Sequence, residues 1–346
     1  GLSERIEAMG IKFGLWFEPE MTNKDSDLYR AHPDWILHTP GRNASHGRYQ
    51  YVLDFSRKEV VEYIYEMMAK ILSEAKVSYI KWDMNRSITE CYSVALPADR
   101  QGEVFHRYIL GVYDLYERLT SEFPEVLFES CSSGGGRFDP GMLYYAPQGW
   151  TSDDSDAIER LKIQYGTSLC YPISSMGSHV SVIPNHQVFR KTPLHTRANV
   201  AYFGTFGYEL DLNSLKEEEI AEVKEQIIFM KKYRKLFQFG DFYRLKSPFE
   251  GNETIWMVVS EDKKTAIVGY YRTLNGVNQA YSRIKLQGLD PDMLYENILN
   301  KTENYGDELM NFGLITTDVT AGEVPGDATP CTDFESRIYI LKAKEK

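Results

Sequence analysis

The sequence predicts an α/β protein in which a barrel of the (β/α)8 type precedes a small antiparallel β-sandwich. Two observations support the barrel. Strand, polar loop and helix alternate along residues 1–240, and the expected strands end in acidic, glycine-rich or aromatic loops. A third observation supports the sandwich, because β-rich runs separated by Gly, Asn and Asp turns fill residues 241–346. A doubly wound sheet is the rival for the first domain, but no GxGxxG motif follows any expected strand.

The barrel elements follow from apolar periodicity. The opening residues are expected to form a helix with Leu2, Ile6 and Met9 on one face, so the chain begins within an element, as a fragment would. An S-x-x-E capping box at Ser56 and Glu59 is expected to start the next long helix. Strands are expected at residues 11–20, 49–56, 77–85, 126–131, 149–156, 171–177 and 201–207.

The long helices are expected to bury one apolar stripe each. A second capping box, at Ser214 and Glu217, is expected to start the last helix before the β domain. In the two central helices the expected buried residues are Val60, Ile64, Met67, Ile71 and Ala75, and then Phe105, Tyr108, Val112, Leu115 and Leu119.

Composition narrows the class of partner. The formal net charge of −11 repels phosphate backbones and anionic lipid, so nucleic acid and membrane surfaces are not expected partners. No run of 18 or more apolar residues is present, so no transmembrane helix is expected. A neutral sugar is compatible with this charge, and the 24 tyrosines and 5 tryptophans are residue types typical of sugar-binding clefts.

The cysteines indicate a reducing compartment. Their scattered positions contain no CxxC spacing, which argues against both a disulfide scaffold and a structural zinc site. We therefore expect free thiols and a cytoplasmic location. The four residues are Cys91, Cys131, Cys170 and Cys331.

The segment KWDMNR carries the strongest local signal. Side chains alternate along a strand, so Lys81, Asp83 and Asn85 share one face at the end of an apolar run. A lysine beside an aspartate keeps the carboxylate ionised, which suits a nucleophile. The alternative interpretation is a buried structural ion pair.

The segment TSDDSD carries the second signal. Asp153, Asp154 and Asp156 crowd one strand end, and crowding raises a carboxylate pKa toward the range of a general acid. An N-cap cluster is an alternative. A metal site is not expected, because the glycine and distal glutamate of a calcium loop are missing.

Two carboxylates on different strand ends suggest glycoside hydrolysis. Chemistry alone does not choose the pair, because Glu18, Glu20 and Glu129 are strand-end acids too. The loop CSSGGGRFD lacks the GK[ST] of a phosphate loop, so its glycines are expected to let a ligand approach the backbone closely. Cys131 has no adjacent histidine and is expected to line a pocket.

Eight motifs follow one another in order: FGLWFEPEM, HPDW, GRYQYVLDFS, YIKWDMNR, ESCSSGGGRFD, WTSDDSDAIERLKIQYG, MGSHVS and FGTFGYELDL. Together they resemble the bacterial α-galactosidases of glycoside hydrolase family 36, from residue 11 to about 212 and more loosely through the β domain. The resemblance implies that Asp83 is the nucleophile and Asp153 the acid/base. It places in the galactose pocket Trp16, Arg48, Lys81, Asn85 and Cys131.

The resemblance also implies a reaction. Terminal α-galactose would be released from melibiose- or raffinose-type galactosides with retention of configuration, through a galactosyl-enzyme intermediate and without a cofactor or metal. Lys81 and Arg48 would hold Asp83 ionised and bind sugar hydroxyls. The alternatives are an α-galactosyl transferase of the raffinose-synthase type and a non-catalytic galactoside-binding module.

Parts of the family pattern have no counterpart here. The family grips galactose with a pair of adjacent aspartates on an earlier barrel strand, and it has a large N-terminal β domain; neither precedes Gly1. About six βα units are therefore expected, with the run containing Phe13 and Leu15 as an edge strand. The isolated fragment is expected to be poorly stable and weak or inactive, and the full-length protein to be a homo-oligomer.

Overall fold

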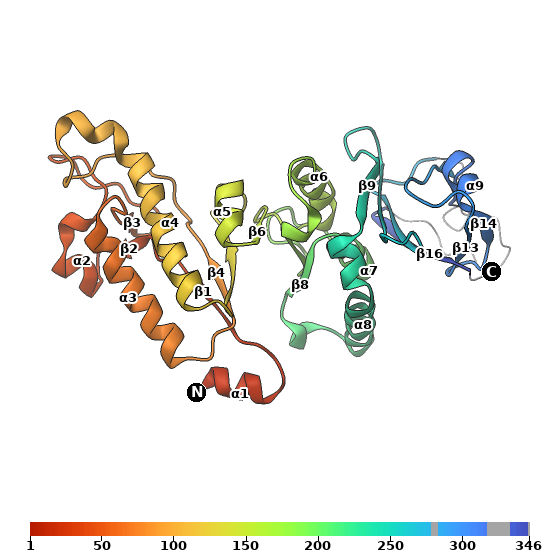
Figure 1. Cartoon of the computed structure of the whole chain (residues 1–346), viewed down its shortest axis with the longest axis horizontal. Helices are drawn as coiled ribbons and strands as arrows, with labels where there is room; N and C mark the ends of the chain where they lie inside the picture. The colour runs from red at the N-terminus through yellow and green to blue at the C-terminus, as the bar shows by residue number, and fades with distance from the viewer. Residues whose placement is uncertain (278–282, 317–332, 345–346) are drawn as a thin grey trace. The chain divides into compact units, whose positions relative to one another are not determined.

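The computed structural model describes residues 1–277, 283–316 and 333–344 and contains two compact units, Gly1–Asp153 and Asp154–Lys346 (Figure 1). No helix in these described ranges has the length and apolar character needed to cross a membrane.

A parallel sheet forms the centre of the first unit. Its strands run in the order β1-β4-β5-β6, and β1 lies at the end of that order, where it pairs with β4. The predicted edge strand is therefore confirmed for Leu15, whereas Phe13 of the same run precedes β1. The strands are β1 (Gly14–Phe17), β4 (Tyr79–Trp82), β5 (Leu127–Ser130) and β6 (Gln148–Trp150).

Two long helices pack beside each other against these strands, α3 (Lys58–Glu74) and α4 (Val104–Glu122) (Figure 1). The predicted stripe of α3 is only partly right, because Met67 and Ile71 are exposed. The buried positions recur every four residues from Val60, at Ile64, Met68 and Leu72. The prediction instead took a three-residue step after Ile64, to Met67, and so left the buried face. The buried residues of α3 are Val60, Val61, Ile64, Met68 and Leu72, and those of α4 are Val104, Tyr108, Val112, Leu115, Tyr116 and Leu119.

The remaining elements of the first unit connect or flank this layer. The expected strand at 49–56 is shorter than predicted and pairs in a separate antiparallel hairpin, β2 (Met21–Asn23) with β3 (Gln50–Val52). The first helix is α1, and both its Leu2 and Met9, which follows its last residue, are exposed. The flanking helices are α1 (Leu2–Ala8), α2 (Asp27–Ala31), η1 (Pro33–Trp35), η2 (Ala98–Glu103) and α5 (Pro140–Tyr145).

The second unit begins with two further βα elements. Strands β7 (Met176–Ser181) and β8 (Thr205–Glu209) pair in parallel. With the four strands of the first unit they make six parallel strands within residues 1–240, all of which the structure describes, as predicted. The helices are α6 (Ala157–Ser168), η3 (Ile173–Ser175), α7 (Leu194–Ala201), η4 (Leu212–Ser214) and α8 (Glu217–Phe239).

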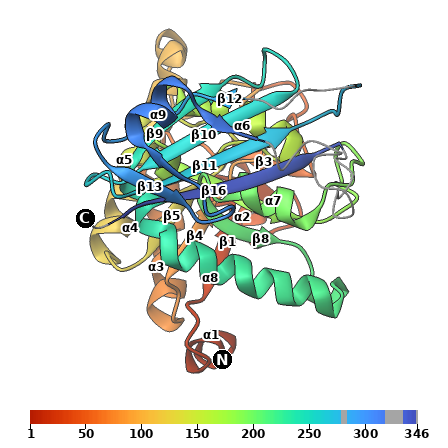
Figure 2. The same cartoon turned by 90° about the vertical axis from the view of Figure 1, so that its right-hand side faces the viewer.

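From Asp241 onward the strands are antiparallel. The main sheet has the order β14-β13-β16-β11-β10-β9, and β10, β11 and β16 lie side by side in Figure 2. A two-stranded sheet shares its apolar core through Ile284 and Leu314. The elements are β9 (Asp241–Lys246), β10 (Glu253–Val259), β11 (Thr265–Arg272), β12 (Arg283–Ile284), β13 (Leu294–Asn297), β14 (Glu303–Tyr305), α9 (Gly306–Asn311), β15 (Leu314–Ile315) and β16 (Glu335–Ala343).

The opposite side of this sheet contacts the preceding helices. The ring of Phe203 lies edge-on to Trp256, with centroids 5.5 Å apart, and the Tyr271 hydroxyl donates to the Asn199 carbonyl at 2.6 Å. These contacts cross residue 240, so the predicted division into 1–240 and 241–346 stays a prediction.

Both predicted capping boxes are wrong in position. Helix α3 begins at Lys58, and the Ser56 hydroxyl donates instead to the carboxylate of Asp54 at 2.5 Å. Helix α8 begins at Glu217, and Glu219 accepts from the backbone N–H of Lys216 at 3.0 Å.

Candidate active site

The carboxyl ends of the parallel strands in the first unit bring the predicted polar residues to one edge. Backbone bonds continue past the strands: the N–H of Asp83 donates to the Phe17 carbonyl at 2.8 Å, and the N–H of Cys131 to the Trp82 carbonyl at 2.7 Å. Residues that follow β1, β4 and β5 are therefore held side by side. This is the edge at which barrel enzymes place their catalytic groups.

Asp83 is the centre of the hydrogen-bond network at this edge. It is buried, and its Oδ2 accepts from the Trp16 indole N–H at 3.2 Å and from the Asn85 amide at 2.7 Å. Its Oδ1 accepts from the backbone N–H of Met84 at 2.9 Å. The predicted proximity of Asp83 and Asn85 is thus present, and Trp16 joins them from the neighbouring strand.

These bonds keep Asp83 ionised. Burial acts to raise its pKa, but donation by the Cys131 thiol, Asn85, Trp16 and the Met84 backbone outweighs it, so the pKa lies below its usual value. Burial and the negative charge of Asp83 raise the pKa of the Cys131 thiol to about 12. The thiol therefore stays protonated at neutral pH and acts as a donor, not as a nucleophile.

Lys81 was expected beside Asp83, but its ion-pair partner is Glu129. Its ammonium group lies 3.7 Å from Oε1 of the buried Glu129 and 4.7 Å from the ring centroid of Trp150. The other Glu129 oxygen accepts from the Tyr79 hydroxyl and the Gln148 amide. Lys81 thus compensates Glu129, and hydrogen bonds, not this lysine, account for the lowered pKa of Asp83.

Arg48 likewise pairs with a carboxylate other than Asp83. Its guanidinium donates to Glu18 at 3.1 Å, and Glu18 also accepts from Gln50 at 2.9 Å and from Asn85 at 2.7 Å. Asn85 therefore joins two carboxylates, Glu18 and Asp83. The sequence did not reveal that Glu18 accepts from Arg48, Gln50 and Asn85, although its place two residues after Trp16 puts both on one face of the extended chain.

Glu20 is structural. It is inaccessible to solvent and forms a two-pronged ion pair with Arg137 at 2.8 and 2.9 Å. The Trp82 indole N–H donates to it at 2.8 Å, and the Tyr108 hydroxyl donates as well. A carboxylate with this number of donors and no exposure is not a candidate for contact with a ligand.

The glycine loop after β5 fits closely against the end of β6. A Cβ atom at Gly134, where φ is +83°, would lie 2.7 Å from the Cα of Ser152 and 2.8 Å from the backbone nitrogen of Asp153. One at Gly135 would lie 2.5 Å from the Thr151 carbonyl oxygen. These glycines therefore let the backbone after β6 approach closely, in the place where a ligand was expected to approach. The close contact positions the backbone that carries Asp153.

The three aspartates after β6 have separate roles. Asp153 is exposed at the end of the first unit. In the second unit Asp156 caps α6 by accepting from the N–H groups of Ile158 and Glu159, both at 3.1 Å. Burial raises the pKa of Asp156 despite its ion pair with Arg190. Asp154 accepts from the backbone N–H of Asp156 at 3.0 Å.

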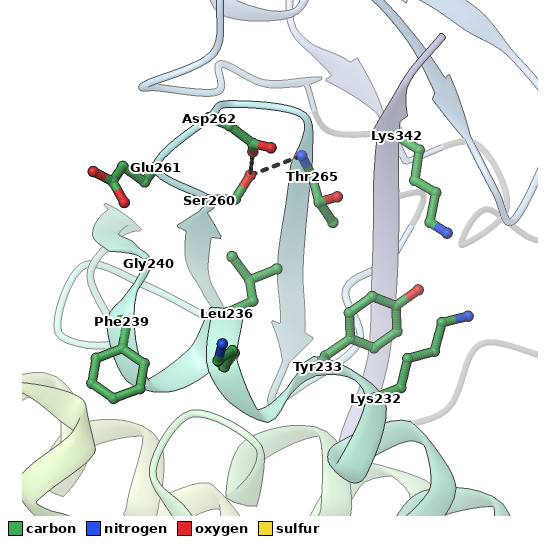
Figure 3. A pocket seen from close by; sticks show the side chains of 11 residues that line it. Lys232, Tyr233, Leu236, Phe239, Gly240, Ser260, Glu261, Asp262, Thr265 and Lys342 are labelled. Carbon is green, nitrogen blue, oxygen red and sulfur yellow. Dashed lines mark hydrogen bonds between the residues drawn. The ribbon is translucent and has the colours of Figure 1, made fainter. Parts of the chain in front are cut away.

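The described residues also include three free thiols and a hollow in the second unit. Cys91, Cys131 and Cys170 are free thiols, as expected, and Cys331 lies outside the described residues. A hollow of about 660 Å³ in the second unit is lined by the end of α8 and the β10–β11 turn (Figure 3). There Ser260 donates to Asp262 at 2.7 Å and accepts from the Thr265 N–H at 3.0 Å, bonds that stabilise the turn itself.

Comparison with known protein families gives two matches. The Melibiase family matches residues 1–240, and the glycosyl hydrolase family 36 C-terminal domain matches residues 253–341. Among curated relatives, the chain is 56% identical to alpha-galactosidase AgaA of Geobacillus stearothermophilus over 100% of this chain and 46% of that protein. It is 48% identical to alpha-galactosidase Mel36A of Lactobacillus acidophilus over 99% of this chain and 45% of that protein.

Solved structures agree with this result. The crystal structure of the GH36 alpha-galactosidase AgaA superimposes with a TM-score of 0.93 at 53% identity, covering 99% of this chain and 46% of that one. The alpha-galactosidase of Lactobacillus brevis gives a TM-score of 0.95 at 51% identity, again over 99% and 46%. Variants of AgaA have been solved in complex with raffinose and with stachyose. The chain spans about half the length of the relatives that it matches.

Proposed function

Because this chain belongs to glycoside hydrolase family 36, we propose that the protein carrying it is a retaining α-galactosidase. The observation that carries the proposal is the ionised, multiply hydrogen-bonded carboxylate of Asp83 at the end of β4. Its substrates are α-galactosides of the melibiose and raffinose type. Relatives of this chain bind raffinose and stachyose in their solved complexes, which supports this substrate class.

In the first half of the proposed reaction, Asp83 attacks the anomeric carbon. A bond forms between a carboxylate oxygen and that carbon as the bond to the leaving oxygen breaks, and Asp153 gives its proton to the leaving oxygen. The donors on Asp83 keep it unprotonated for this step. A carboxylate has about four lone-pair sites, and the four donors fill them, so the attacking oxygen gives up one of these hydrogen bonds as the bond to carbon forms.

In the second half, Asp153 takes a proton from water. The water oxygen attacks the same carbon, the bond to Asp83 breaks, and two inversions give net retention. Asp153 is the nearest of the three aspartates to the end of β6, whereas Asp154 and Asp156 lead directly into α6. This difference favours Asp153 as the acid/base.

The other predicted residues are proposed to bind the sugar. The indole of Trp16 is 49% exposed while its N–H reaches Asp83, so one side of the ring can contact galactose. Lys81, Arg48, Asn85 and Cys131 supply donors around the same edge. The reaction needs no cofactor or metal.

Partners and location are further parts of the proposal. We expect a neutral galactoside as ligand, no nucleic acid or membrane partner, a homo-oligomer and a cytoplasmic location. Sedimentation of the full-length protein and fractionation of cells would test the last two.

Release of 4-nitrophenol from its α-galactoside by the full-length protein, with the α-glucoside as control, tests the activity. Hydrolysis of the galactoside with α-galactose as the first product seen by proton NMR is expected. Cleavage of the glucoside at a similar rate, or of neither compound, would contradict the proposal. Transfer of galactose to another sugar would use the same acids, so product analysis with a sugar acceptor separates a transferase from a hydrolase. A non-catalytic module would bind the sugar without turnover.

A further inference from the structure

A hollow in the first unit lies beside the β2–β3 hairpin, and Asp83 is not among the residues that line it. Its volume is about 420 Å³, within the range of small-molecule sites. Aromatic and polar side chains line it together. They are Asn23, Lys24, Asp25, Arg30, His46, Tyr49 and Tyr51.

The turn that carries Tyr49 has an unusual backbone. Gly47 and Gln50 exchange two backbone hydrogen bonds, at 3.2 and 2.8 Å, so Arg48 and Tyr49 are the central residues of a two-residue turn. Their φ angles are +51° and +63°. Turns of this kind strongly prefer Asn-Gly, because bulky residues are strained at positive φ. Two large side chains here suggest a function for both, since such strain concentrates at functional sites.

A partly buried cation stabilises this turn. The guanidinium of Arg86 donates to the carbonyls of Ser45 at 2.6 Å and Gln50 at 2.9 Å, and to the Ser45 hydroxyl at 2.9 Å. The backbone on both sides of Arg48 and Tyr49 is therefore held. The strained conformation is imposed by its surroundings.

The side chains of the two central turn residues, Arg48 and Tyr49, contact different parts of the molecule. Arg48 reaches Glu18, which is joined through Asn85 to Asp83. Tyr49 is 79% exposed and lines the hollow. The turn thus places an exposed aromatic ring next to a residue of the proposed galactose site.

The aromatic lining is preorganised. The ring of His46 stacks on Tyr49, with centroids 6.0 Å apart and planes at 14°, and meets Tyr51 edge-on at 6.1 Å. Tyr51 is fixed from behind by stacking on Tyr29 at 5.3 Å. Rings held in this way lose little conformational freedom when a ligand binds.

The polar rim suits a neutral ligand. Arg30 donates to Asp25 at 2.7 Å and pairs with Asp27 as well, so its charge is compensated. The Oδ1 of Asn23 accepts from the backbone N–H of Asp25 at 2.8 Å, and its Nδ2 amide hydrogens can donate to a ligand. Aromatic faces beside hydrogen-bonding groups of both kinds match the C–H face and the hydroxyls of a sugar ring.

We propose that this hollow is a second sugar-binding subsite, which holds a sugar on the leaving-group side of an α-galactoside longer than a disaccharide. The assignment rests on the proposed function, since it takes the galactose end to lie at Asp83. Tyr49 supplies the stacking surface, and His46 and Tyr51 keep it in place.

The decisive variant is Tyr49→Gly in the full-length protein. Glycine removes the ring and also relieves the positive φ, so the turn is expected to be retained and the melting temperature not lowered. We expect kcat/KM for stachyose to fall about tenfold, while that for 4-nitrophenyl α-galactoside stays within about twofold. The matched control is Tyr144→Ala, which removes a tyrosine ring that is 78% exposed on α5, and it should change neither value.

Two results would overturn the subsite. The first is a change in kcat/KM that is equal for stachyose and for 4-nitrophenyl α-galactoside in Tyr49→Gly. The second is an unchanged kcat/KM for stachyose, which is expected if another part of the full-length protein covers this hollow. Calorimetric titration with stachyose separates this proposal from the proposed function. Stachyose binding that is weakened by Tyr49→Gly in a protein unable to hydrolyse 4-nitrophenyl α-galactoside would support the subsite and refute the hydrolase.

Discussion

Removing the Cys131 thiol tests the electrostatic description of Asp83. In Cys131→Ala the carboxylate loses the strongest of the donors that lower its pKa, while its burial remains. A hydrogen bond to a charged group contributes about 1.5–3 kcal/mol, and a thiol belongs at the low end. One pKa unit corresponds to about 1.4 kcal/mol, so the pKa of Asp83 should rise by about one unit.

The direction of the effect on activity follows from the ionised form that attack requires. The pKa of Asp83 is lowered, so activity is present above that pKa and falls as pH decreases through it. Raising the pKa moves this loss to higher pH. The acid limb of kcat/KM for 4-nitrophenyl α-galactoside, measured between about pH 3 and 8, should shift up by about one unit in Cys131→Ala.

Cys131→Ser is the matched control, because serine keeps an O–H donor in nearly the same volume. Its acid limb should shift by less than half as much. An unshifted or downward-shifted limb in Cys131→Ala, or equal shifts in the two variants, would refute the reasoning.

Three further predictions follow from other contacts. Asp153→Ala should retain far more activity on 4-nitrophenyl α-galactoside than on raffinose, because a good leaving group needs no proton; equal losses would assign the acid/base role elsewhere. Arg137→Met leaves the buried charge of Glu20 uncompensated and should lower the free energy of unfolding of the full-length protein by about 3–5 kcal/mol in denaturant titrations; a loss below about 1 kcal/mol would contradict the structural role of the pair. Gly134→Ala should displace the backbone at Ser152 and reduce kcat at least about tenfold. The control Gly102→Ala, in which the added Cβ meets no atom within 4 Å, should leave kcat unchanged. Equal kcat in both variants would refute the role of Gly134 in positioning Asp153.

Local apolar pattern predicted much of the fold. The run 77–85 is apolar on one face and polar at its end, and it contains β4 followed by Asp83. The order of parallel strands and helices, and the change to antiparallel strands after residue 240, were equally visible. These features depend on periodicity within a few residues, which a single sequence displays directly.

Strands without an apolar run were harder to place. The predicted strand 171–177 covers η3 and only the start of β7, which is Met176–Ser181. The sequence MGSHVS has small and polar residues, and Ser178 and Ser181 are buried through side-chain bonds to Gln164 and to the Ser155 carbonyl. Such partners lie far along the chain, so the local pattern does not reveal them.

In the candidate site, too, the local sequence predicted contacts between near neighbours but not those between distant residues. That Asp83 and Asn85 share a face follows from strand alternation, and the structure places them in contact. The partners of Lys81 and Arg48 depend on neighbouring strands and on the hairpin turn, and the sequence interpretation assigned both to Asp83. In the structure they pair with Glu129 and Glu18.

The most direct test of Asp83 as nucleophile is rescue of Asp83→Ala by azide. Loss of the attacking carboxylate should lower kcat on 4-nitrophenyl α-galactoside by about 10⁴-fold or more. Azide entering the vacated face should restore part of the rate and give β-galactosyl azide, identified by the anomeric proton coupling in NMR. Near-normal activity of Asp83→Ala without azide, or an azide product of the α configuration, would contradict the assignment.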